Sequence, residues 1–109
     1  MDNIEGVLNT VQVVLVGTTI ANFLLNTGRL SPAIELCKEC LSLLNSQPLD
    51  KDGPITHSIL VQQGRLNLLL ATTLYTQSKF VEARKFYERA IKTMKRMTTN
   101  EEKQFVTEA

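Results

Sequence analysis

The chain has 109 residues, of which 43% are hydrophobic and 21% are charged. This size allows one domain, and the composition excludes a wholly disordered chain. The net charge of +1 argues against a protein built mainly to hold nucleic acid. Charge is nevertheless unevenly distributed, because residues 1–50 carry −3 and residues 51–109 carry +4. Opposite halves of this kind can attract each other within one chain or between copies.

The first predicted element is an apolar segment without charge. Between Glu5 and Arg29 lie 23 residues with no charged side chain, including VLNTVQVVLVGTTIANFLL at 7–25. A secretory signal is disfavoured because the residues before it are acidic and no small-residue cleavage site follows. A membrane span is disfavoured because the segment contains asparagine, glutamine and threonine side chains, which are costly in lipid. A membrane-associated adaptor anchored by residues 7–25 stays open as an alternative.

The first half of the segment, residues 7–14, is too apolar to face water alone. Its β-branched residues are compatible with a helix or a strand. The second half starts a helix from about Leu15, with Ile20, Ala21 and Leu24 expected to point inward. We expect the earlier residues to form a surface that a second copy covers, since interface cores are depleted in charge. The predicted dimer interface consists of Val7, Leu8, Val11, Val14 and Leu15.

The next predicted element is a turn followed by a second helix. Thr27-Gly28-Arg29 ends the first helix, and Gly28 suits the left-handed cap position. Ser31 and Pro32 then predict a serine N-cap with proline at the first helical position.

The second half of the chain repeats this arrangement. The Pro-, Gly- and Asp-rich stretch 45–54 predicts a loop. A helix is expected from near Pro54 to about Gln77, and a short Ser78-Lys79 turn leads into another helix. That helix carries an apolar face made of Phe80, Ala83, Tyr87, Ala90, Ile91 and Met94.

A further helix is predicted to start at the end of the chain. Thr99 and Glu102 form a T-x-x-E capping box, which predicts a new helix over residues 100–109. The short distance to the last residue favours a fragment of a longer repeat protein. No β-hairpin signal occurs in the sequence, so the predicted fold class is all-α.

The two helix pairs resemble each other and a known family. A shift of 50 residues places Ala21 on Ala71 and Ala33 on Ala83. In the second unit, A-x2-L-Y-x4-F-x2-A-x3-Y-x2-A resembles the tetratricopeptide repeat (TPR), a helix pair of about 34 residues. The signature positions are occupied by Leu70, Ala71, Leu74, Phe80, Ala83, Tyr87 and Ala90.

The resemblance implies a definite architecture. It assigns repeat-like units to about 14–47 and 64–97, within one domain over 1–109. The implied fold is a TPR-like superhelical array of antiparallel helix pairs, with about five helices in all. Such repeats form protein–protein interaction scaffolds, and a chain with two of them needs further burial from a partner or a second copy.

The first unit departs from the TPR pattern at three positions. Gly17 stands where a large aromatic residue is common, and Cys37 and Cys40 stand where an aromatic residue and alanine are usual. The resulting C-x-x-C lies in the middle of a predicted helix, whereas redox motifs of this form open one. A zinc site needs four ligands, and His57 is the chain's one histidine. We therefore expect core packing for both cysteines, no metal, no cofactor and no enzymatic activity.

The layout also resembles a particular set of TPR proteins. An atypical apolar helix pair, a loop and then a good repeat are similar to the start of the TPR subunits of the anaphase-promoting complex. That resemblance implies protein partners and self-association through the N-terminal repeat. The low cysteine content favours a reducing compartment, so we expect the cytoplasm, the nucleus or both.

A partner groove follows from the TPR resemblance, because the first helices of successive pairs line a concave face. The implied groove residues are Thr18, Asn22, Asn26, Arg65, Leu68, Thr72 and Tyr75. Chaperone-binding TPR domains hold a terminal carboxylate in a clamp, of which Asn22 alone matches here. A peptide-binding adaptor of the co-chaperone type is therefore a second alternative.

The last predicted helix carries a basic stripe. Its residues recur at spacings of four, three and four, and they are Lys85, Arg89, Lys92 and Arg96. A stripe of this kind is either a solvated outer face or a dock for an acidic segment of a partner or of the same protein. Nucleic acid is disfavoured, because no aromatic residues interleave with the charges.

Overall fold

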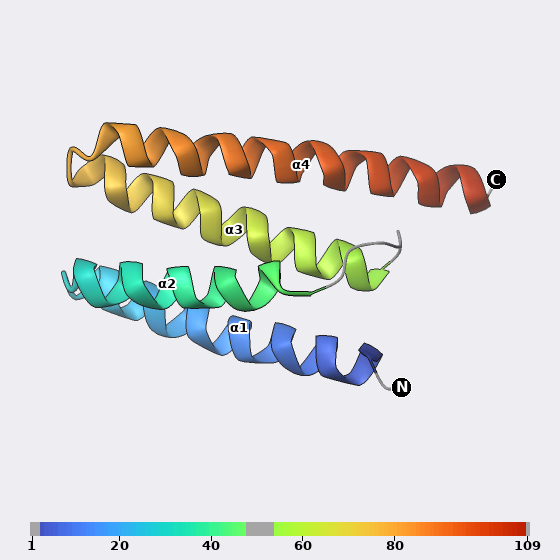
Figure 1. Ribbon diagram of the computed structural model, residues 1–109, viewed down its shortest axis with the longest axis horizontal. Helices are drawn as coiled ribbons and strands as arrows, with labels where there is room; N and C mark the ends of the chain where they lie inside the picture. The colour runs from blue at the N-terminus through green and yellow to red at the C-terminus, as the bar shows by residue number, and fades with distance from the viewer. Residues whose placement is uncertain (1–2, 48–53, 109) are drawn as a thin grey trace.

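The computed structural model describes residues 3–47 and 54–108. These ranges contain four helices and no strand: α1 (Asn3–Asn26), α2 (Leu30–Asn45), α3 (Pro54–Thr76) and α4 (Phe80–Glu108). α1 and α2 form one antiparallel pair, α3 and α4 form another, and α2 lies beside α3 (Figure 1). Both tight turns lie at one end of the molecule and both termini at the other. The predicted all-α array of antiparallel helix pairs is confirmed.

The turn between α1 and α2 is the predicted glycine cap. Gly28 has a positive φ of 81°. The Arg29 N–H donates to the Leu24 carbonyl at 2.8 Å, and the Gly28 N–H donates to the Leu25 carbonyl at 3.1 Å. These two bonds make a Schellman motif, in which the residue at positive φ ends the helix.

The turn between α3 and α4 repeats this motif 50 residues later. The Lys79 N–H donates to the Leu74 carbonyl, and the Ser78 N–H donates to the Tyr75 carbonyl, both at 2.9 Å. Ser78 occupies the glycine position with a φ of 63°. The internal repeat inferred from sequence therefore recurs in the backbone hydrogen bonds.

The predicted serine cap of the second helix is wrong. α2 begins at Leu30, and Arg29 takes the N-cap position without a side-chain hydrogen bond. Arg29 is also the last residue of the Schellman motif, so the connection leaves no position for a separate serine cap. Pro32 falls in the first turn, where its missing N–H needs no helical acceptor.

The helix predicted over residues 100–109 does not begin at the capping box. α4 continues from Phe80 to Glu108, so the described residues form four helices where about five were expected. The Thr99 hydroxyl donates to the Lys95 carbonyl at 3.2 Å, four residues back in the same helix. This bond is typical of a threonine inside a helix and takes the place of a cap.

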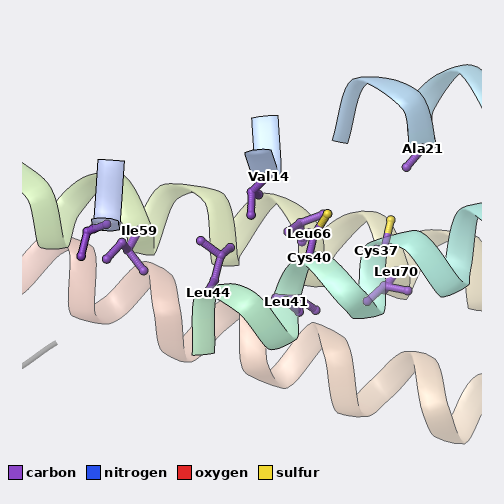
Figure 2. Packing of buried hydrophobic residues seen from close by; sticks show 10 residues of the cluster. Val14, Ala21, Cys37, Cys40, Leu41, Leu44, Ile59, Leu66 and Leu70 are labelled. Carbon is purple, nitrogen blue, oxygen red and sulfur yellow. The ribbon is translucent and has the colours of Figure 1, made fainter. Parts of the chain in front are cut away.

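The core lies where α1, α2 and α3 meet (Figure 2). α3 contributes Ile59, Leu66 and Leu70, α2 contributes Leu41, Leu44 and the two cysteines, and α1 contributes the smaller Val7, Val14 and Ala21. Three pairs of positions related by the 50-residue shift are buried at both members. They are Ala21 and Ala71, Ala33 and Ala83, and Cys40 and Ala90. The sequence repeat is therefore a repeat of packing positions.

α1 and α2 approach each other closely at Gly17. A Cβ atom added there would lie 2.6 Å from the Cys40 sulfur. The two departures from the TPR pattern thus compensate each other, because a small residue on α1 makes room for a residue larger than alanine on α2. Interiors are close-packed, so such paired changes in volume are the ones a core tolerates.

Candidate functional site

A hollow of about 610 Å³ lies between α2 and α4. We call it the α2–α4 groove. The residues of its lining that carry charge or an amide are Lys38, Asn45, Gln63, Asn67, Arg89 and Lys92. Leu41 and Phe86 add apolar surface, and none of the lining residues within 3–47 and 54–108 is acidic.

The floor of the groove consists of buried amides from α3. Gln63 and Asn67 are one helical turn apart and are both buried. The Gln63 Nε2 donates to the Asn45 Oδ1 at 3.1 Å, which links α3 to α2. Because this bond uses the oxygen of Asn45, its amide nitrogen keeps two donors for another acceptor.

The α4 wall presents two cations, Arg89 and Lys92. The Arg89 guanidinium carbon lies 5.0 Å from the centroid of the Phe86 ring, in cation–π geometry. This contact does not use up the N–H donors of the guanidinium, which can still donate to a hydrogen-bond acceptor. Lys38 completes the cationic rim from the α2 side.

Only two of the four residues of the predicted basic stripe line the groove. Arg89 and Lys92 line it, whereas Lys85 and Arg96 are exposed and do not belong to its lining. The acidic Glu88 pairs with Arg84 at 3.5 Å on an exposed part of α4. Sequence reasoning found the charges and missed the amides. The signal was available, because Gln63 and Asn67 are polar residues spaced by four inside an apolar helix.

The residues of the predicted dimer interface do not share one environment, because some are buried within the chain and others are exposed. Val14 has no exposed surface and Val7 is also buried, so both belong to the chain's own core. Val11 packs against that core. The prediction that another chain covers Val7 and Val14 is wrong, because α2 and α3 already cover this face of α1, whereas a role of the partly buried Val11 in an interface stays a prediction. Leu8 and Leu15 are exposed, and their role in an interface stays a prediction.

A different face of α1 carries the larger apolar surface. Val13, Val16, Ile20 and Phe23 recur at spacings of three, four and three, and they are 58, 61, 47 and 64% exposed. We call these four residues the outer stripe. Ile20 was expected to point inward and does not. The outer stripe is continuous because residues at three- and four-residue spacing share one helix face.

The predicted partner groove lies on exposed helix faces. Asn22 and Asn26 of α1 are exposed, as are the α3 residues Arg65, Leu68, Thr72 and Tyr75. Thr18 is half-buried, and its hydroxyl donates to the Val14 carbonyl at 2.8 Å.

Two further groove residues have partners inside the chain. The Thr72 hydroxyl donates to the Leu69 carbonyl at 3.0 Å, and Tyr75 packs edge-on against Phe80 with 5.2 Å between ring centroids. Binding by this face stays a prediction.

Cys37 and Cys40 are free thiols buried in the core, as expected. Burial raises the pKa of Cys37 to about 11, with a smaller contribution from Cys40. Burial, assisted by Glu39, also raises the pKa of Cys40. A high pKa keeps the reactive thiolate scarce near neutral pH, which disfavours a redox role. Among the described residues, no group of three or more His, Cys, Asp or Glu could hold a metal ion.

The raised thiol pKa predicts a loss of stability in alkali. The folded chain keeps a proton on Cys37 up to about pH 11, whereas the unfolded chain releases it near 9.0. The contribution of Cys37 to the free energy of unfolding is therefore fully present below pH 9. It is lost between pH 9 and 11, which lowers the stability by on the order of 2 kcal/mol. Urea unfolding at pH 8 and pH 10.5 measures this loss. Cys37→Ala should flatten the dependence, and an equal loss in both proteins would contradict the assignment.

One comparison with known proteins gives a match. No curated protein and no solved structure matches the chain. Residues 69–97 match the family described as the tetratricopeptide repeat. The matched segment begins in α3, crosses the Schellman turn at Ser78 and ends within α4. Residues 69–97 of this chain are therefore similar to a tetratricopeptide repeat, and they lie in an all-α array of two helix pairs.

Proposed function

We propose that the chain is a non-catalytic protein–protein interaction module that self-associates through the outer stripe of α1. The tetratricopeptide repeat at 69–97 supports the interaction class, because this family generally consists of interaction repeats. The observation that carries the self-association is the run of four exposed apolar side chains on α1.

The outer stripe has the properties of an interface core. Val13 and Phe23 are ten residues apart, so the stripe extends about 15 Å along the helix. No charged residue lies between Glu5 and Arg29, in agreement with the depletion of charge at interface cores. Two copies of α1 packed about a twofold axis would bury both stripes against each other. Phe23 is the largest exposed side chain of the stripe and the expected anchor.

The dimer proposal extends to a larger assembly. The apolar first pair, the loop and the repeat with a long first helix are similar in layout to the start of the TPR subunits of the anaphase-promoting complex. Subunit seven is the most similar of these in layout. On this proposal the chain is a scaffold in the cell cycle and the ubiquitin conjugation pathway, in the cytoplasm, the nucleus or both.

Val16→Glu tests the dimer. A charge at the centre of the outer stripe should convert a dimer into a monomer in sedimentation velocity at micromolar concentration, because each copy would bury an unpaired carboxylate. Helicity should be unchanged, since Val16 is already exposed in the single chain. The matched control is Val81→Glu on α4, where the valine is 75% exposed and lies outside the outer stripe. A monomeric wild type, or a dimer that survives Val16→Glu, would refute the proposal.

A membrane surface is the competing occupant of the outer stripe. The helix from Gly6 to Asn26 is long and apolar enough to cross a membrane, and 28% of its apolar window is buried. The hydroxyls of Thr10 and Thr19 donate to carbonyls four residues back, which lowers the cost of placing them in lipid. Co-sedimentation of the full chain with phosphatidylcholine vesicles, lost in Phe23→Glu, would favour the membrane-associated adaptor.

A further inference from the structure

We propose that the α2–α4 groove binds an acidic peptide segment of a partner protein. The groove lies on α2, α3 and α4, so its residues are distinct from the outer stripe of α1. The inference therefore stands apart from the proposed self-association.

The charges of the groove favour a carboxylate-bearing ligand. Lys38 stands on the α2 rim, and Arg89 and Lys92 stand on the α4 rim, with no acidic residue in the described part of the lining. Cations on facing helices repel each other, and an acidic ligand between them relieves that repulsion while gaining charge-assisted hydrogen bonds. Arg89 is well placed for this, because its contact with Phe86 leaves the N–H donors of its guanidinium available.

The amides of the groove favour a peptide backbone over a simple anion. Asn67 is 6% exposed, lines the groove and has no side-chain hydrogen-bond partner among the residues that the structure describes. A buried amide in this condition gains when a ligand supplies both a donor and an acceptor. Each residue of an extended peptide offers one N–H and one C=O. The free amide nitrogen of Asn45 supplies a further donor on the α2 side.

The dimensions of the groove set the length of the segment. Lys38 and Asn45 are seven residues apart on α2, which is about 10 Å along the helix axis. An extended chain covers that distance with about three residues, at about 3.3 Å each. We therefore expect a short extended core containing two or three Asp or Glu residues.

Fluorescence anisotropy with a fluorescein-labelled peptide, Gly-Gly-Glu-Glu-Glu-Gly-Gly, tests the proposal. We expect saturable binding at 50 mM NaCl that weakens as salt increases. Arg89→Gln and Lys92→Gln should each weaken binding at least fivefold. Lys85→Gln removes the same charge from the same helix outside the groove, and it should change binding less than twofold. The probe with glutamine in place of glutamate should bind at least tenfold more weakly.

A substitution that changes no charge distinguishes specific binding in the groove from general electrostatic attraction between the peptide and the protein. Asn67→Leu changes no charge, and leucine is close to asparagine in size. The substitution should weaken binding of the probe at least threefold, and the helicity of the protein should be retained. Three outcomes would overturn the proposal: no saturable binding, equal losses in Lys85→Gln and Lys92→Gln, or loss of self-association in Lys92→Gln, which would make a second copy the occupant. Val16→Glu, which tests the dimer, should leave probe binding intact.

Discussion

We expect Leu66→Ala to lower the free energy of unfolding by about 2–5 kcal/mol, the range for large-to-small changes in a well-packed core. Leu66 has no exposed surface and lies in the cluster that joins α3 to α1 and α2 (Figure 2). Removing its branched end leaves a cavity that three packed helices cannot easily close. A small domain is stable by only about 5–15 kcal/mol, so this single change should remove a large part of the total.

Urea denaturation followed by circular dichroism measures the effect of Leu66→Ala. Leu68→Ala is the matched control, because it makes the same change two residues away at a side chain that is 48% exposed. The control should cost less than about 1 kcal/mol, since little buried area is lost. Equal losses at the two positions would show that the core does not lie where α3 meets α1 and α2.

Gly17→Ala is the second substitution with a large expected effect. The new Cβ would lie 2.6 Å from the Cys40 sulfur, so α1 and α2 must move apart or the thiol must turn within a packed core. Overpacking of this kind costs about 1–3 kcal/mol, against which alanine regains up to about 1 kcal/mol of helix propensity. A net loss of stability is expected in thermal or urea unfolding.

A double-mutant cycle isolates the contact between Gly17 and Cys40. Cys40→Ala removes the sulfur that the new Cβ would meet, so Gly17→Ala should cost less in that background by at least about 1 kcal/mol. Gly6→Ala is the control on the same helix, because nothing lies within 4 Å of a Cβ added there. It should be neutral or stabilising. Additive effects of the substitutions at 17 and 40 would contradict the close approach.

The turns and helix pairs could be predicted because they depend on local sequence. Gly28 marks one turn through its freedom at positive φ, and the Ser78-Lys79 turn follows from the 50-residue shift. α2 could be oriented as well, since its apolar residues occupy one side, and Cys37 and Leu44 are buried as expected.

The sequence did not show which face of α1 is buried, because apolar residues occur on all faces of this helix. Val13 and Val16 look like Val7 and Val14 in the sequence, yet the first two are exposed and the others buried. Only the positions of α2 and α3 decide which valines are covered. α4 shows a related limit, because α3 is the helix against which it packs. A single neighbour covers a narrow stripe, so Ala83 and Ala90 are buried while Ile91 and Met94 of the predicted face remain exposed.

The α2–α4 groove was predictable in part. Arg89 and Lys92 share a helix face by their spacing, which is a local property. Lys38 and Asn45 belong to α2, more than 40 residues away in the chain, and only tertiary packing brings them opposite the stripe. The spacing of Gln63 and Asn67 inside an apolar helix was a signal for a polar stripe on α3, but only the packed structure shows that a hollow lies beside it.

The central position of α3 has a consequence for folding cooperativity. α3 packs against all three other helices, whereas α4 packs against α3 alone. The matched repeat, residues 69–97, contains only the last part of α3 and lacks Ile59 and Leu66, which hold that helix to the first pair. The repeat is therefore a unit of sequence without being a unit of folding. Part of the packing that orders α3 comes from the first helix pair, so we expect residues 69–97 alone not to fold.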